Sequence, residues 1–134
     1  MTRAFLDTNI LVYAFSDDAR NAVAEQILGK GGEISIQVVN EFSNVARRKL
    51  GFDWLQISEA VDAIRTLARG IHLLDLETHA EAIRLADRYG FSFYDALIVA
   101  SALRAKCDLL YTEDMQSGLL VDGTLRIENP FQPG

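Results

Sequence analysis

The sequence predicts an α/β fold of three layers, in which a central, mainly parallel sheet is flanked by helices. Two observations support this prediction. Short apolar segments alternate with longer amphipathic segments along the whole chain, as strands alternate with helices in such folds. Most of the short segments are apolar at consecutive positions, which is typical of parallel strands buried on both faces.

Two strands and three helices are predicted in the first half of the chain. Their order is strand 3–6, helix 8–15, helix 19–29, strand 33–36 and helix 38–49. Asp18 precedes the second helix, and Gly29 ends it. An aspartate side chain often accepts backbone N–H groups at a helix N-terminus, so we expect Asp18 to cap this helix.

The second half continues the alternation. Its predicted order is helix 58–69, strand 71–74, helix 78–89, helix 93–106, strand 109–111 and strand 125–127. Thr78 and Glu81 have the spacing of a capping box, which predicts a helix start at this point. The helix at 93–106 is long and strongly apolar, so we expect it to be buried.

Composition predicts one soluble domain that spans residues 1–134. The chain is 49% hydrophobic and 24% charged, and no apolar run approaches the ~20 residues that a membrane span needs. No signal peptide is recognisable. A single cysteine, Cys107, excludes an intramolecular disulfide and fits a reducing compartment, so we predict a cytoplasmic protein. The net charge of −6 does not favour nonspecific binding of nucleic acid.

Four acidic residues stand at one predicted edge of the sheet. Asp7 follows the first strand within "FLDTNIL", and Asp114 follows a later strand within "LLYTEDM". Glu41 lies early in the helix after the second strand, and Asp95 begins the apolar helix in "FSFYDALIVAS". Ligands of open parallel sheets bind beyond the carboxyl ends of the strands, and all four acids are predicted there.

Each acid also has a purely local interpretation. Asp7 fits an ordinary helix cap, and Asp95 forms a capping-box pattern with Ser92. Glu41 fits a solvated helix surface, and Asp114 fits a turn. These interpretations do not account for the convergence of four acids on one edge of one sheet.

Converging carboxylates repel one another and raise one another's pKa, so protons or a cation must occupy the cluster. Hard oxygen ligands without a cysteine or histidine set point to Mg²⁺ or Mn²⁺ rather than zinc. The two histidines, His72 and His79, do not form a ligand pair. We expect His72 to pack in a strand and His79 to lie on a helix surface.

The segments "FLDTNILVYAF", "VVNEFSNVARRK", "FSFYDALIVASAL", "LLYTEDM" and "IENPF" together resemble a PIN domain. The chain is most similar to the toxins of bacterial VapBC toxin–antitoxin pairs. The resemblance implies a PIN-like fold and a Mg²⁺- or Mn²⁺-dependent ribonuclease, with RNA as substrate, a cognate antitoxin as partner and a homodimer. By position it implies the acidic quartet Asp7, Glu41, Asp95 and Asp114 as catalytic and metal-binding residues. It also implies that Asn9 and Thr112 support the metal site without binding the ion.

The expected chemistry is hydrolysis of a phosphodiester by a water activated by metal. The resemblance implies products with a 5′-phosphate and a 3′-hydroxyl. We expect Asp7, Asp95 and Asp114 to bind metal, and Glu41 either to bind metal or to orient the attacking water. The basic run 47–49 fits an RNA contact, but it equally fits a helix C-terminus, where cations are favoured.

Two alternatives remain at this point. A phosphatase of the haloacid dehalogenase type also begins with a strand that ends in Asp, but it requires a second Asp two residues later, where this chain has Asn9. A non-catalytic module with the same fold would bind RNA or protein without cleaving it. The intact acids argue against this second alternative.

Overall fold

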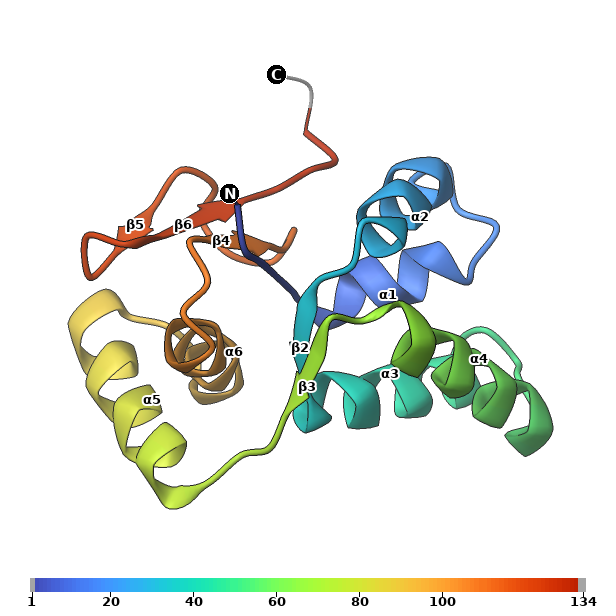
Figure 1. Ribbon diagram of the computed structural model, residues 1–134, viewed down its shortest axis with the longest axis horizontal. Coiled ribbons are helices and arrows are strands. Elements are labelled where there is room, and N and C mark those ends of the chain that lie inside the picture. Colours follow the sequence, from blue (N-terminus) through green and yellow to red (C-terminus); the bar gives the residue numbers. More distant parts are fainter. Residues whose placement is uncertain (1, 133–134) are drawn as a thin grey trace.

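A six-stranded sheet forms the centre of the computed structural model, which describes residues 2–132 (Figure 1). The strands are β1 (Ala4–Leu6), β2 (Glu33–Ser35), β3 (Gly70–His72), β4 (Leu109–Tyr111), β5 (Leu120–Val121) and β6 (Leu125–Glu128). Their order across the sheet is β3-β2-β1-β4-β6-β5. All neighbours pair in parallel except β5 with β6, so the predicted mainly parallel sheet is confirmed.

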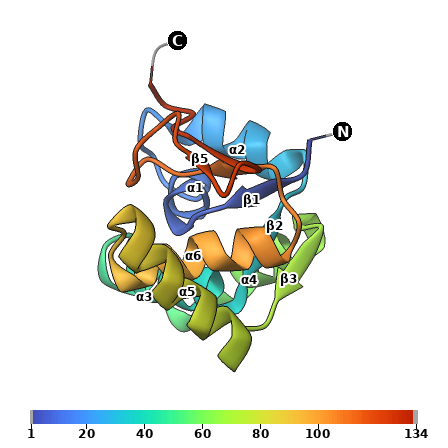
Figure 2. The ribbon, with the colours of Figure 1, turned by 90° about the vertical axis from the view of Figure 1, so that its left-hand side faces the viewer.

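Six helices surround the sheet: α1 (Thr8–Ala14), α2 (Asn21–Gly29), α3 (Ile36–Arg48), α4 (Trp54–Leu67), α5 (Leu76–Tyr89) and α6 (Phe93–Arg104). Figure 1 shows α5 and α6 on one side of the sheet and α1 to α4 on the other, and Figure 2 turns the α5–α6 side toward the viewer. The predicted three layers are therefore present. None of these six helices combines the length and the apolarity that a membrane span requires.

The core lies where α6 packs on the central strands. Seven consecutive residues of α6, from Ala96 to Ala102, are buried, which confirms the expected buried helix. Phe5 and Leu6 of β1 and Leu110 of β4 are fully buried beside it. Side chains on both faces of these strands are covered, which explains why the strands are apolar at consecutive positions.

Three predicted helix starts are wrong, although the helices themselves exist. Helix α2 begins at Asn21, and its cap residue Arg20 makes no side-chain cap bond. Asp18 does not cap α2, because its carboxylate accepts the backbone N–H and the guanidinium of Arg20 instead. Helix α4 begins at Trp54 rather than Ser58, because Asp53 forms a capping box there.

The third wrong start belongs to α5, which begins at Leu76 rather than Thr78. Asp75 caps this helix: its carboxylate accepts both the backbone N–H and the hydroxyl of Thr78. Thr78 is therefore the third residue of the helix, not its cap. An ionised carboxylate is a stronger acceptor than a hydroxyl, so the aspartate further upstream sets the helix start.

The strand order reverses beside β1. Successive parallel strands run from β1 to β2 and β3 in one direction, and then β4 pairs on the other side of β1. In sheets of this kind the crevice between the two central strands opens at their carboxyl ends, and this is where ligands bind. Here that point lies between the end of β1 at Leu6 and the end of β4 at Tyr111.

Candidate active site

Asp7 stands directly at the end of β1, in the crevice between β1 and β4. Its backbone N–H continues the strand pairing by donating to the carbonyl of Tyr111 at 3.0 Å. Its carboxylate accepts the N–H of Thr8 at 2.6 Å and the hydroxyl of Thr112 at 2.7 Å. Asp7 is therefore the cap of α1 as well as a buried acid, with a side chain only 5% exposed.

Burial raises the pKa of Asp7 from 3.8 to about 6. The hydrogen bonds from Thr112 and Thr8 favour the ionised carboxylate and oppose this rise, whereas the charges of Asp114 and Asp95 add to it. The raised pKa means that the ionised form of Asp7 is poorly compensated by the protein alone. A bound cation would supply the missing compensation.

Thr112 and Asn9 connect Asp7 to Asp114. The buried Thr112 hydroxyl donates to Asp7 and accepts the backbone N–H of Asp114 at 3.1 Å. The Asn9 amide donates to the Asp114 carboxylate at 3.1 Å and more weakly to Thr112 at 3.4 Å. The other end of the amide, Asn9 Oδ1, is buried and has no hydrogen-bond donor among residues 2–132. An unpaired buried acceptor beside these acids is suited to a cation or to its bound water.

Asp95 reaches the same edge from the N-terminus of α6. Ser92 caps this helix by accepting the N–H of Asp95 at 3.3 Å, so the expected capping interaction is present. The Asp95 carboxylate is half-buried, and burial raises its pKa. The charges of Asp114 and Glu41 raise this pKa further, although the hydrogen bond with Ser92 lowers it.

Glu41 projects from the first half of α3 and is held by two side chains that sequence reasoning missed. The hydroxyl of Thr8 donates to its Oε2 at 2.7 Å, and the Gln37 amide donates to its Oε1 at 2.9 Å. Thr8 thus bonds to Asp7 through its backbone and to Glu41 through its side chain. Glu41 is half-buried and oriented, so the interpretation as a freely solvated helix residue is wrong.

Thr8, Asn9 and Thr112 therefore link Asp7, Glu41 and Asp114 by hydrogen bonds, and Asp95 is related to these acids by electrostatic influence alone. Within the described chain, however, no three acidic, histidine or cysteine side chains are arranged as a ready-made metal site. The residues present still fit a hard divalent cation, because they offer carboxylate oxygens, two carboxyl groups with raised pKa and an unpaired amide oxygen. Their role as metal ligands stays a prediction.

A cleft of about 540 Å³ opens beside these acids, between α1 and α3. Thr8, Asn9, Glu41 and Asp114 line one end of it. The rest of its wall consists of Val12, Tyr13, Ser16, Asp18, Asn44, Val45, Lys49 and Leu50.

The three basic residues of the run 47–49 differ in their surroundings. Lys49 is the one that lines the cleft. The Arg47 guanidinium instead lies over the Trp54 ring, 5.0 Å from its centroid, and donates to the carbonyl of Phe52. Arg47 and Arg48 lie in the last turn of α3, where their positive charges interact favourably with the negative end of the helix dipole.

An aromatic and charged group forms the rim of the cleft, and sequence reasoning did not identify it. The Tyr13 hydroxyl donates to Glu113, which also accepts Arg20 at 3.2 Å. The Arg20 guanidinium lies 4.3 Å from the centroid of the Tyr13 ring, and Phe131 packs edge-on against this ring at 5.2 Å. Burial and Glu113 raise the pKa of Tyr13 to about 12. Glu113 therefore bonds to Tyr13 and Arg20 and to none of the four predicted acids.

Comparisons with known proteins agree with this architecture. A family model described as PIN domain matches residues 4–116. No curated protein sequence matches the chain. Among solved structures, a chain of a toxin–antitoxin complex from Klebsiella pneumoniae superposes with a TM-score of 0.74 at 22% identity, over 97% of this chain and 99% of that chain.

Two further solved structures have the same fold. The Mycobacterium tuberculosis toxin VapC20, which cleaves the sarcin–ricin loop, matches with a TM-score of 0.68 at 21% identity, over 83% of this chain and 91% of its own. A chain of VapBC2 from Rickettsia felis, bound to a DNA fragment from its promoter, matches with a TM-score of 0.64 at 20% identity, over 96% and 98%. At these identities the likeness establishes the fold.

Proposed function

The chain belongs to the PIN domain family, and we propose that it is a Mg²⁺- or Mn²⁺-dependent endoribonuclease that acts as the toxin of a type II toxin–antitoxin pair. The observation that supports this proposal is the raised pKa of Asp7 and of Asp95, which burial causes and which the charges of Asp114, Asp95 and Glu41 increase, with Asp7 in the crevice between β1 and β4. Such a site is favourable for a hard cation.

Each residue of the site has a defined task in this proposal. Asp7, Asp95 and Asp114 would hold the ion, and Glu41 would either join them or orient the attacking water. When bound, a divalent ion lowers the pKa of a coordinated water and offsets charge on the phosphoryl oxygens.

Thr112 and Asn9 act by positioning the acids. The Thr112 hydroxyl fixes the Asp7 carboxylate, and the Asn9 amide fixes Asp114. A carboxamide does not gain or lose a proton near neutral pH, so Asn9, whose amide donates to Thr112 and Asp114, cannot act as a general acid or base. The amide therefore does not replace the second aspartate of a haloacid dehalogenase phosphatase.

The reaction is hydrolysis of a phosphodiester bond. The water oxygen attacks phosphorus, the bond from phosphorus to O3′ breaks, and the proton lost by the water is balanced by protonation of the 3′-oxygen. The products carry a 5′-phosphate and a 3′-hydroxyl. In this proposal Glu41, held by Thr8 and Gln37, would bind metal or orient the attacking water, and Lys49, which lines the cleft, would contact a phosphate of RNA.

The proposal includes a cognate antitoxin and a homodimer. Solved relatives of this fold come from toxin–antitoxin complexes of Klebsiella pneumoniae and Rickettsia felis. The net charge of −6 is complementary to a basic partner. A cytoplasmic location follows from the proposed RNA substrate and agrees with a single, unpaired cysteine.

The first test is RNA cleavage by the purified chain and by Asp7→Asn. We expect cleavage with Mg²⁺ or Mn²⁺ and none in EDTA, and we expect Asp7→Asn to lower the rate at least about 100-fold, because it removes a charged ligand. Asp87→Asn, an identical change at an exposed position of α5, is the matched control and should retain the wild-type rate. Undiminished cleavage in EDTA would contradict the proposal.

The second test is expression in a bacterial host. We expect expression of the wild-type chain to stop growth, Asp7→Asn to relieve the arrest, and co-expression of a small neighbouring reading frame to restore growth. Normal growth with abundant folded protein, together with RNA binding without cleavage, would instead establish the non-catalytic binding module.

A further inference from the structure

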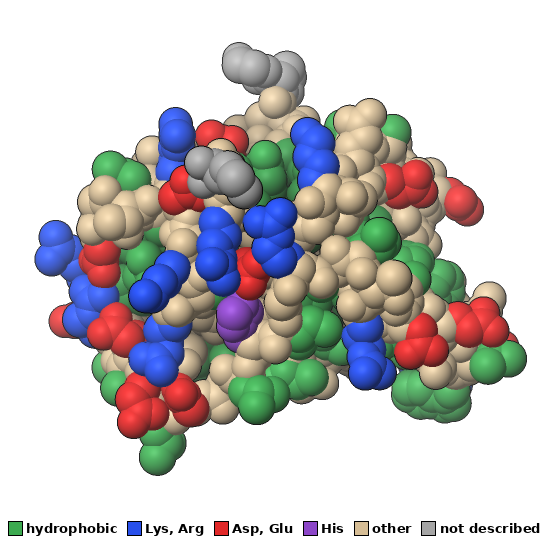
Figure 3. All heavy atoms as spheres, viewed as in Figure 1, with side chains coloured by type: hydrophobic (Ala, Val, Ile, Leu, Met, Phe, Trp, Pro, Cys, Tyr) green, Lys and Arg blue, Asp and Glu red, His purple; other side chains and the backbone are tan. Residues whose placement is uncertain are grey.

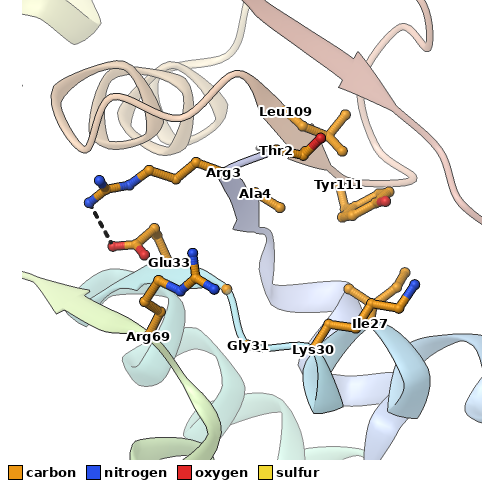
Figure 4. Close-up of a pocket in the computed structure, with 11 residues that line it drawn as sticks. Thr2, Arg3, Ala4, Ile27, Lys30, Gly31, Glu33, Arg69, Leu109 and Tyr111 are labelled. Carbon is orange, nitrogen blue, oxygen red and sulfur yellow. Dashed lines mark hydrogen bonds and ion pairs between the residues drawn. The ribbon is translucent and has the colours of Figure 1, made fainter.

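A second hollow lies at the opposite edge of the sheet, where the strands begin. It encloses about 310 Å³ between the starts of β1, β2 and β4 and the end of α2 (Figure 4). The hollow lies at the start of β1 and Asp7 follows its end, one three-residue strand of about 10 Å away, although Tyr111 at the end of β4 also lines the hollow. The hollow shares no lining residue with the cleft beside the acids.

Three cationic side chains from three separate segments line this hollow. Arg3 precedes β1, Lys30 follows α2 and Arg69 precedes β3. Among residues 2–132, Lys30 and Arg69 take part in no ion pair, and Arg3 pairs only with Glu33, at 3.4 Å. Figure 3 shows Lys and Arg side chains gathered on this face of the molecule, although the chain carries a net charge of −6. Free cations concentrated on an acidic protein favour an anionic ligand.

Backbone contacts position the two chain segments that carry Arg69 and Lys30. Arg69 donates its N–H to the carbonyl of Gly32 at 2.8 Å, which ties the start of β3 to the start of β2. Gly31 has a φ of +76°, and a Cβ at this position would lie 3.3 Å from the carbonyl oxygen of Leu67. The turn that carries Lys30 past the hollow therefore favours glycine at position 31.

Apolar side chains form the other part of the wall. Ile27, Leu109 and Tyr111 line the hollow, and Tyr111 is only partly buried. Figure 4 shows Arg69 and Glu33 on one side of the hollow and Ile27, Lys30 and Tyr111 on the other. An aromatic ring and aliphatic carbons suit the face of a nucleobase, whereas a bare inorganic anion would gain nothing from them.

Glu33 is the buried acid of this wall. Its side chain is almost fully buried, and its Oε1 is bound by Arg3 and by His72 at 2.8 Å. The ion pair with Arg3 holds that guanidinium beside the hollow. The other oxygen, Oε2, is enclosed by protein atoms, so a ligand in the hollow does not contact it.

We propose that this hollow is a nucleotide-binding pocket. Arg69, Lys30 and Arg3 contact the phosphate from the rim, and Ile27 and Tyr111 contact the base. The nucleotide is either free or an unpaired nucleotide of a longer RNA, since both present the same phosphate and base. This pocket does not depend on cleavage at the acids.

The test is equilibrium binding of AMP to the full chain, measured by calorimetry in EDTA. We expect Arg69→Gln to weaken AMP binding at least about tenfold, because it removes a charge-assisted contact. Arg65→Gln is the matched control: this exposed arginine of α4 lies outside the hollow, and we expect its variant to bind AMP as the wild type does. Inorganic phosphate should bind at least about tenfold more weakly than AMP, because it makes no base contacts.

Competition by a short single-stranded RNA identifies the source of the nucleotide. Displacement of AMP supports the pocket as a contact for RNA, and failure to displace it supports the pocket as a site for free nucleotide. Thermal unfolding of each variant establishes that it is folded. The proposal is overturned by the absence of saturable AMP binding, by equal loss in Arg69→Gln and Arg65→Gln, or by phosphate binding as tightly as AMP. Retention of AMP binding in Asp7→Asn would separate this pocket from the proposed nuclease site.

Discussion

Each edge of the sheet contains one buried carboxylate, and the two edges compensate it in opposite ways. Asp7 lies at the edge formed by the carboxyl ends of the strands (the carboxyl edge) and is 5% exposed. Glu33 lies at the edge where the strands begin (the amino edge) and is 2% exposed. Asp7 accepts neutral donors from Thr8 and Thr112 and lies within the influence of other carboxylates. Glu33 is instead bound by Arg3 and His72.

Because of this difference, the two edges favour ligands of opposite charge. Burial raises the pKa of Asp7 to about 6, and the charges of Asp114 and Asp95 add to the rise, so the carboxyl edge favours a cation. The amino edge already supplies a counter-charge to its acid in Arg3 and has further cations in Lys30 and Arg69, so it favours an anion. Burial of a carboxylate therefore does not identify the function of a site, whereas the charge of its neighbours does.

The strongest way to test this comparison is the stability of Asp7→Asn in EDTA. A folded-state pKa of about 6 against 3.8 unfolded corresponds to about 3 kcal/mol of destabilisation when the carboxylate is ionised. Because the folded pKa is raised, the folded state holds its proton more tightly. Wild-type stability attributable to Asp7 is thus complete below about pH 4 and is lost as the pH rises through about 6.

Removing the charge removes this loss. We expect Asp7→Asn to be about 3 kcal/mol more stable than the wild type at pH 8 and close to it at pH 4, as measured by urea unfolding. The matched Asp87→Asn variant should stay within about 0.5 kcal/mol of the wild type at both pH values. Parallel curves for the wild type and Asp7→Asn would show that Asp7 is compensated as well as Glu33 is.

Thr112→Val tests the neutral donors at the carboxyl edge. Valine has a similar shape but lacks the hydroxyl that donates to Asp7 and accepts from Asp114 and Asn9. We expect a loss of about 2 kcal/mol at pH 8, the range for a hydrogen bond to a charged group. The Thr112 hydrogen bond lowers the pKa of Asp7, so in the variant the loss of stability should begin at the same pH as in the wild type but continue to a higher pH.

A double-mutant cycle completes this test. In an Asp7→Asn background, the cost of Thr112→Val should fall by about 1 kcal/mol or more, because the charged acceptor is already absent. Equal costs in both backgrounds would show that Thr112 stabilises the fold through packing alone. Unfolding of all four proteins in urea at pH 8 measures the cycle.

The alternation of short apolar segments with amphipathic segments predicts the strands and also where each strand ends. It therefore predicted which residues lie at the carboxyl edge of the sheet. Asp7 follows β1 directly and Asp114 comes three residues after β4, so their placement depends mainly on recognising these two strands. The contacts of Thr8 and Gln37 with Glu41 were not predictable in this way, because they depend on how α1 and α3 pack. Local cap signals also failed where two acceptors competed, as at Asp75 and Thr78.

The amino edge and the antiparallel strand β5 were harder to predict from the sequence pattern. β5 has two residues, too few for a period to appear. Asp122 and Gly123, both with positive φ, form a turn between β5 and β6, and this Asp-Gly pair was the available signal. At the amino edge, Arg3, Lys30 and Arg69 are far apart in the sequence, and they come together only because β1, β2 and β3 align in register.

Glu33→Gln is the smallest of the expected effects, and it tests the compensated edge. Glutamine keeps an acceptor for Arg3 and His72 but loses the charge, and both partners are partly exposed, with side chains 46% and 34% accessible. We therefore expect a loss of only about 1 kcal/mol, smaller still in 1 M NaCl because salt screens exposed partners. Glu59→Gln, an exposed change on α4, is the control. If Glu33→Gln instead stabilised the protein as Asp7→Asn should, a buried carboxylate would be equally unfavourable at both edges, and the counter-charge of Arg3 and the hydrogen bond of His72 would contribute nothing.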